Sequence, residues 1–210
     1  MTVVVPRNRS ITDFTNLEEV TAALKATSLD DSDWMLKNYD EATTLNDPNR
    51  IEDEVERLLA LKSYHILDTD KEVEFEEMTK EAKDYFGVPI AVISLVDLGR
   101  QWFKSVQGLE TDSTPRCLAF CSHLVKREQP GCMVVHDAAQ DDRFKDNPLV
   151  TGGPQVRFYA GAPLITPEGK RIGSFCIIDF KPHPEGLTTT QRDRLELFAR
   201  EAMFQMITRM

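Results

Sequence analysis

The spacing of apolar residues predicts three amphipathic helices. Between residues 47 and 66, and again between 73 and 86, apolar positions recur every three or four residues, and Gly87 is placed to end the second helix. A third helix is predicted from Thr188 to the C-terminus, where Thr188 and Gln191 are spaced as a capping box. The apolar stripe of the first helix is Ile51, Val55, Leu58, Leu59 and Ile66, and that of the third is Leu195, Ala199, Ala202 and Met206.

Between these helices the period changes to that of strands. Residues 88–97 are apolar on both faces, which predicts a central strand, and a turn at 97–100 leads into a more exposed partner strand over 100–108. A short helical or irregular segment at 114–126, a short strand at 131–137 and a loop with one helical turn at 140–153 follow. Residues 157–180 form a second hairpin around the turn Thr-Pro-Glu-Gly-Lys. Hairpins exclude an all-parallel sheet, so the fold class is α+β.

The first 49 residues have a different character. They hold one short helical pattern, with Thr15 and Glu18 spaced as a capping box, among acidic and polar stretches. We expect 1–49 to be a partly ordered extension and 50–210 to be the folded domain. Trp34, Leu36 and Tyr39 are expected to dock on that domain, the alternative being that they bind a partner.

Composition and charge exclude several classes of protein. A net charge of −10 without a basic stripe argues against nucleic-acid binding. The apolar runs are much shorter than the roughly 20 residues that span a bilayer, and the N-terminus lacks the pattern of a secretory signal. We therefore expect a cytoplasmic protein. Its four cysteines are expected to be small buried hydrophobic residues rather than members of disulfides.

The second hairpin carries two charges among apolar residues. If its loop is centred on Glu168, Arg157 lies opposite Asp179, Tyr159 opposite Ile177 and Ala160 opposite Cys176. Phe158, Ala160, Cys176 and Ile178 would then face the helices, and Arg157, Tyr159, Ile177 and Asp179 would face a pocket. The pair of Arg157 and Asp179 either contacts a ligand or is a structural salt bridge.

Seven segments together resemble the GAF domain, a small ligand-binding module of signalling proteins. They run from about Ile51 to the C-terminus in the order of that family: LLALKSYHILDT, PIAVISLVD, RQWFKSVQGL, FCSHLV, VVHDAAQDDRF, VRFYAGAPL and GSFCIIDF. The resemblance implies a central antiparallel sheet of five or six strands with the first and last helices on one face. Loops and short helices over the other face would enclose a small-molecule pocket.

Candidate pocket residues come from three segments of the chain. We expect the ligand site to include Phe120, Cys121, His123, Phe144, Arg157, Tyr159, Ile177 and Asp179. Cys117, Cys121 and His123 would make only a partial metal site, because a fourth ligand must come from elsewhere, so no metal is expected. The sequence identifies no cofactor: the family's cyclic-nucleotide signature is not evident, no Cys-His dipeptide for a bilin is present, and haem on His123 is unsupported.

Two main functions remain open, and a protein-interaction scaffold with an emptied pocket is a weaker third. The first is a non-catalytic sensory module in signal transduction that binds an unidentified small molecule and acts in trans, through its helices or a homodimer formed by the C-terminal helix. The second is a thiol-dependent enzyme resembling free methionine-R-sulfoxide reductase, in which Cys121 occupies a comparable place. The reactive cysteine that this enzyme carries before the late hairpin has no counterpart in RFKDNPLVTGG.

Overall fold

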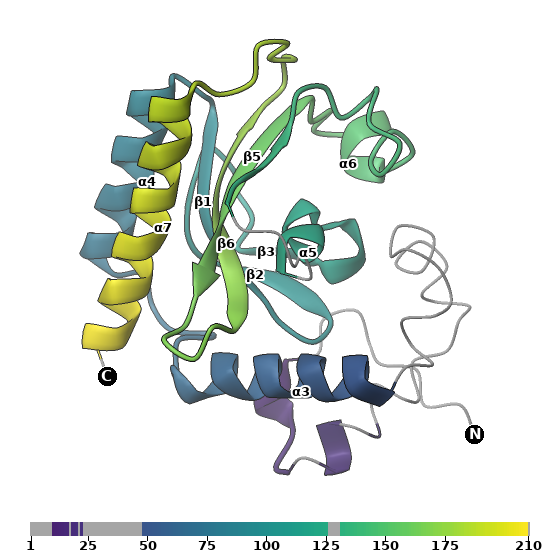
Figure 1. Ribbon diagram of the computed structural model, residues 1–210, viewed down its shortest axis with the longest axis vertical. Helices are drawn as coiled ribbons and strands as arrows, with labels where there is room; N and C mark the ends of the chain where they lie inside the picture. Colours follow the sequence, from purple (N-terminus) through teal and green to yellow (C-terminus); the bar gives the residue numbers. More distant parts are fainter. Residues whose placement is uncertain (1–9, 17, 21, 23–47, 126–130, 210) are drawn as a thin grey trace.

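The fold is described from a computed structural model, which places residues 10–16, 18–20, 22, 48–125 and 131–209 (Figure 1). The helices are η1 (Ile11–Asp13), α3 (Pro48–Ser63), α4 (Val73–Phe86), η2 (Arg116–Leu118), α5 (Phe120–Val125), α6 (Pro148–Thr151) and α7 (Thr189–Thr208). The strands are β1 (Ile90–Val96), β2 (Arg100–Gln107), β3 (Ser113–Pro115), β4 (Met133–Val135), β5 (Phe158–Ile165) and β6 (Arg171–Asp179).

One antiparallel sheet of six strands organises the domain. Its order is β3-β2-β1-β6-β5-β4, so β1 lies inside the sheet between β2 and β6. Every residue of β1 is buried, which confirms the central strand expected from its unbroken apolar run. The α+β fold class and both hairpins are confirmed.

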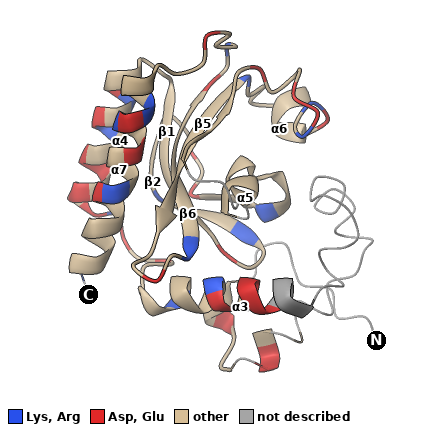
Figure 2. Ribbon diagram, viewed as in Figure 1, with Lys and Arg blue, Asp and Glu red and all other residues tan. Residues whose placement is uncertain are grey.

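Helices and loops cover the two faces of the sheet unequally. Figure 1 shows α4 and α7 side by side on one face, α3 across one end, and α5 and α6 on the other face. The outward surfaces of α4 and α7 carry many charged residues (Figure 2). None of the helices in the described ranges combines the length and apolar character needed to cross a bilayer.

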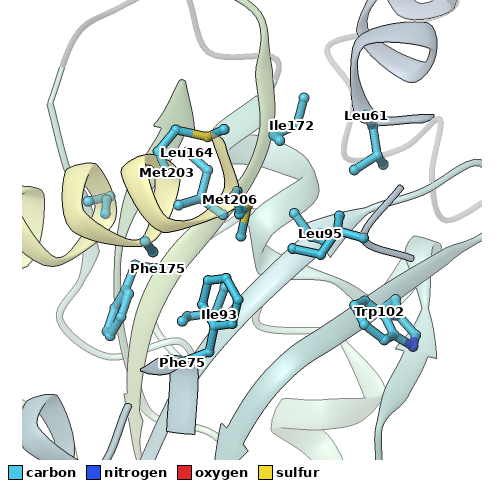
Figure 3. Close-up of a cluster of buried hydrophobic side chains, with 14 of the residues drawn as sticks. Leu61, Phe75, Ile93, Leu95, Trp102, Leu164, Ile172, Phe175, Met203 and Met206 are labelled. Carbon is cyan, nitrogen blue, oxygen red and sulfur yellow. The ribbon is translucent and has the colours of Figure 1, made fainter. Parts of the chain in front are cut away.

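Each face of the sheet has its own apolar core. The helix-side core is illustrated in Figure 3 and includes Leu61, Phe75, Ile93, Leu95, Trp102, Phe175, Met203 and Met206. The loop-side core includes Val92, Val96, Phe120, Cys121, Phe144, Tyr159 and Cys176. Alternate residues of one strand contribute to opposite cores, so a displacement of a central strand moves side chains in both cores.

The predicted helix ends are largely confirmed. Gly87 ends α4 with a φ of 63°, and the Thr188–Gln191 capping box begins α7. The stripe of α3 is partly wrong: Leu59 is 39% exposed, and Leu61 is buried in its place. Ile51, the first residue of the predicted stripe, lies outside the residues whose side chains are described.

The described part of the N-terminal segment packs against the domain. Ile11, Phe14 and Val20 are buried in the helix-side core, and the backbone N–H of Ile11 donates to Asp97 Oδ1 at 2.8 Å. The helix predicted after Thr15 begins one residue later than expected, since the Asn16 side chain accepts from the N–H of Glu19. Leu17, Leu24, Trp34, Leu36 and Tyr39 lie outside the described residues.

Strand β2 is more buried than its alternation predicted. Gln101 to Ser105 are all buried, because β3 pairs with β2 on its outer edge and α4 covers its face. Lys104 is 2% exposed, and its Nζ donates to Thr69 Oγ1, the Asp70 carbonyl and Glu72 Oε1 at 2.6–2.8 Å. A lysine in a strand usually predicts a solvent-exposed position. Here the buried ammonium group is hydrogen-bonded by three acceptors inside the protein.

The predicted register of the second hairpin is correct only beside its turn. Ile165 pairs with Arg171, as a loop centred on Glu168 requires, but Leu164 pairs with Gly173. This β-bulge leaves Ile172 as an extra residue on β6, so Phe158 rather than Arg157 lies opposite Asp179.

The bulge reverses the predicted faces of β6 and leaves those of β5 intact. Tyr159 faces the loop side and Phe158 the helix side, as predicted. The predicted directions of Cys176 and Ile178 are wrong, since both face the loop side, and Ile177 lies in the helix-side core. One unpaired residue is sufficient to reverse the faces of the residues that follow it, because side chains on a strand alternate with a period of two.

Candidate functional site

A stack of aromatic rings fills the loop-side face beneath α5. The Phe120 ring, from the start of α5, stacks on Phe144 at a centroid distance of 4.1 Å and on Tyr159 at 5.2 Å. His123, one turn along α5, meets the edge of Phe144 at 4.8 Å. Phe120, Phe144 and Tyr159 are at most 4% exposed, so this part of the face is packed by side chains.

A polar group of five side chains adjoins this stack through Tyr159, and we call it the thiol cluster: Ser94, Cys121, Tyr159, Ser174 and Cys176. Cys121 is at its centre, where its sulfur accepts from Ser174 Oγ at 2.9 Å and Ser94 Oγ at 3.2 Å. The Tyr159 hydroxyl lies 3.3 Å from the same sulfur, and the Cys176 sulfur lies 3.9 Å from it. All five residues are at most 1% exposed.

The strands position this cluster through their pairing and through a glycine. Ser94 of β1 and Ser174 of β6 are direct cross-strand partners, and their hydroxyls lie 3.2 Å apart. Tyr159 and Gly161 share one face of β5, and a Cβ on Gly161 would lie 2.3 Å from the Tyr159 hydroxyl oxygen. The missing side chain of Gly161 therefore allows the phenol to lie along β5 toward Cys121.

The hydrogen bonds of the cluster separate the acidities of its groups. Burial by itself raises the pKa of Cys121, but hydrogen bonds with Cys176, Ser174, Ser94 and Tyr159 outweigh burial and lower that pKa to about 6. The hydrogen bond with Cys121, together with burial, raises the pKa of Cys176. Burial also raises the pKa of Tyr159, so its hydroxyl keeps its proton. Cys121 is thus the group of the cluster that ionises first.

The structure brings together five of the eight residues expected at the site. Phe120, Cys121, His123, Phe144 and Tyr159 lie together on the loop side.

Of the other three expected residues, Ile177 and Asp179 lie elsewhere, and Arg157 does not form the ion pair expected of it. Ile177 belongs to the helix-side core, and Asp179 pairs with His183 at 2.9 Å. Arg157 and Asp179, both described, share a backbone hydrogen bond but not the predicted ion pair. The reason is the bulge at Ile172, which moves Asp179 opposite Phe158.

Three members of the cluster were missed by sequence reasoning. Cys176 was assigned to the helix side through the wrong register, and Ser94 and Ser174 were not singled out. A serine in the middle of the buried run IAVISLV was an available signal, because a buried hydroxyl requires a hydrogen-bond partner. In the described part of the chain, the cysteine, histidine and acidic side chains form no group of three that could hold a metal ion.

Strand β6 connects the thiol cluster to the helices on the opposite face. Ser174 and Cys176 face the cluster, while Phe175 between them points to the helix side. The Phe175 ring stacks on Phe198 of α7 at 5.1 Å. Phe175 therefore gives the strand that carries the cluster a direct contact with α7.

Comparison with known proteins identifies the family. Residues 70–206, well over half of the chain, match the family model of the GAF domain. A cyclic di-GMP phosphodiesterase of Pseudomonas aeruginosa is 42% identical over 159 residues, which are 75% of this chain and 26% of that protein. The chain thus spans about a quarter of the length of this relative.

Solved structures share the fold at low sequence identity. The GAF domain of an Acinetobacter phosphoenolpyruvate-protein phosphotransferase has a TM-score of 0.54 and 16% identity, over 73% of this chain and 93% of that one. The free methionine-R-sulfoxide reductase of Neisseria meningitidis, solved with its substrate, has a TM-score of 0.52 and 16% identity, over 74% of this chain and 90% of that one. With the family match over residues 70–206, these findings show that the chain belongs to the GAF domain family.

Proposed function

We propose that this chain is a regulatory GAF module that receives a small-molecule signal on its loop-side face and controls the turnover of cyclic di-GMP. The observation that carries the proposal is the thiol cluster, a buried polar site on the sheet face opposite α4 and α7. Support for the output comes from the 42% identical segment, which belongs to a cyclic di-GMP phosphodiesterase. Family membership supports a signalling role.

The burial of the cluster favours regulation over catalysis. A thiol that reduces a molecule as large as methionine sulfoxide must contact that substrate, yet Cys121 is 1% exposed. A signal needs only to shift the balance between two packings of the site. The contact of Phe175 with Phe198 supplies the route from such a shift to α7.

The proposed module acts in the cytoplasm and through its C-terminal helix. Phe204 and Ile207 of α7 are 66% and 39% exposed, and we assign them to a contact with a second copy or with a signalling partner in trans. Residues 1–49 are proposed to be an extension to a domain formed by 50–210. Analytical ultracentrifugation of wild type and Phe204→Glu tests the homodimer: a dimer that persists in the variant would contradict this assignment.

The regulatory role is tested by measuring cyclic di-GMP in cells that express the chain. Wild type is expected to change the cyclic di-GMP level, and Cys121→Ser is expected to lose that effect. Cys132→Ser is the matched control, because Cys132 lies outside the cluster beside Glu196 and should behave as wild type. If Cys121→Ser acts like wild type, the cluster is not the input site.

A thiol-dependent reductase is the alternative, and one observation favours it. The lowered pKa of Cys121 and the nearby Cys176 sulfur are features that thiol chemistry needs. Incubation with free methionine sulfoxide and a thiol donor decides between the two functions. Turnover that is lost in Cys121→Ser would replace the regulatory proposal with the enzymatic one.

A further inference from the structure

We propose that Cys121 and Cys176 form an oxidisable pair, in which a small hydroperoxide oxidises Cys121 and a disulfide to Cys176 then closes between α5 and β6. This inference supplies the chemical input for the proposed regulatory role and rests on that role for its biological consequence. The chemistry itself is a property of the isolated chain.

The geometry of the two sulfurs carries the inference. They lie 3.9 Å apart, which is close to van der Waals contact, and a disulfide requires them to approach by only about 2 Å more. The two cysteines belong to different elements, and the bulge at Ile172 is what turns Cys176 toward Cys121. With the predicted register, the two thiols would have been on opposite faces of the sheet.

The surroundings of Cys121 favour its ionised form. Ser94, Ser174 and Tyr159 place hydroxyl groups within 3.3 Å of the sulfur, and these stabilise a thiolate by hydrogen bonding. The lowered pKa of Cys121 agrees with this arrangement. Cys176, whose pKa is raised, keeps its proton until the second step, when it gives that proton to the departing hydroxide.

The proposed reaction proceeds in two balanced steps. The Cys121 thiolate attacks the nearer peroxide oxygen, the O–O bond breaks, and the product alkoxide or hydroxide takes up a proton, leaving Cys121 as a sulfenic acid. The Cys176 sulfur then attacks the Cys121 sulfur, an S–S bond forms and the S–O bond breaks. The thiol proton of Cys176 leaves with the hydroxide as water, so two thiols are oxidised and one peroxide is reduced.

Burial selects for small, uncharged oxidants. Cys121 is 1% exposed and Cys176 is fully buried, so a bulky or charged thiol reagent cannot reach them in this packing. Hydrogen peroxide is uncharged and smaller than two water molecules, and it can enter during local opening of the stack. Cys132 provides an internal comparison, because it is more exposed and its pKa is raised to about 12 by burial and by Glu196.

Peptide mapping of the full chain tests the proposal. The protein is treated with hydrogen peroxide, the remaining thiols are alkylated after denaturation, and the digest is analysed without reduction. We expect a cross-linked peptide pair that contains Cys121 and Cys176, with two hydrogen atoms lost and restored by a thiol reductant. Oxidation at Cys121 should be at least about tenfold faster than at Cys132.

Two single variants separate the steps. In Cys176→Ser, a dimedone adduct should accumulate on Cys121, because no thiol is present to remove the sulfenic acid. In Cys121→Ser, Cys176 should stay alkylatable after peroxide treatment.

The wild-type protein alone can overturn the proposal. Recovery of both cysteines as thiols, or a stable sulfenic acid on Cys121 without a cross-link, would do so. A cross-link that forms without any change in cellular cyclic di-GMP would instead contradict the proposed function and leave the oxidisable pair intact.

Discussion

Truncation of Phe120 tests whether the loop-side face is packed as described. Phe120 is 4% exposed and stacked between Phe144 and Tyr159, so Phe120→Ala removes a buried ring from two aromatic contacts. Buried Phe→Ala changes cost about 3–5 kcal/mol, because apolar contacts are lost and a cavity remains. Each aromatic pair contributes about 0.5–1.5 kcal/mol of that loss. We therefore expect the free energy of unfolding to fall by about 4 kcal/mol in urea denaturation.

Phe180→Ala is the matched control for this prediction. Phe180 follows β6 and is 41% exposed, so the same substitution there should change stability by only about 1 kcal/mol or less.

A second readout follows from the position of Cys121, which comes next to Phe120 in α5 and lies 3.3 Å from the Tyr159 hydroxyl. A bulky aromatic thiol reagent should modify Cys121 at least about tenfold faster in Phe120→Ala than in wild type, because the cavity opens a path to the sulfur. Equal destabilisation by Phe120→Ala and Phe180→Ala, with no gain in Cys121 reactivity, would refute the packing of this face.

Three further predictions concern Gly161, Lys104 and Glu72. Gly161→Ala should destabilise the protein by about 1–3 kcal/mol, because the new Cβ displaces the Tyr159 phenol. The pKa of Cys121 should rise for the same reason, and a thiol titration that gives an unchanged pKa would contradict this. Lys104→Met should lower the free energy of unfolding by about 3 kcal/mol in urea denaturation. This is near the low end for a broken buried ion pair, because Glu72 keeps its ion pair with Arg209. A decrease of less than about 1 kcal/mol would contradict this prediction. Burial raises the pKa of Glu72, but Lys104 and Arg209 outweigh it and lower that pKa below its usual 4.5. Stability from Glu72 is therefore complete above pH 4.5 and lost as pH falls toward the folded-state pKa, so Glu72→Gln should lose less stability than wild type between about pH 6 and about pH 4.

Sequence patterns predicted most of the fold because its main signals are local. The run IAVISLV specified a strand buried on both faces, and the Thr188–Gln191 capping box specified the start of α7. The burial of Lys104 could not be predicted, because its three acceptors come from residues 69–72, which are distant in sequence.

The candidate site was predicted on α5 and β5 and missed on β6. A turn centred on Glu168 correctly predicts that Ile165 pairs with Arg171. One extra residue at Ile172 then shifted all later pairs, and no residue type in RIGSFC requires a bulge there. Cys176 was placed on the wrong face for this reason.

The central claim is that the thiol cluster communicates with α7 through β6. Hydrogen–deuterium exchange of the full chain, reduced and peroxide-treated, tests it most directly. We predict that amides of α7 around Phe198 change their exchange rate after oxidation, that amides of α3 do not, and that Cys176→Ser abolishes the change. If the disulfide forms and the exchange of α7 stays the same, the cluster does not signal through that helix.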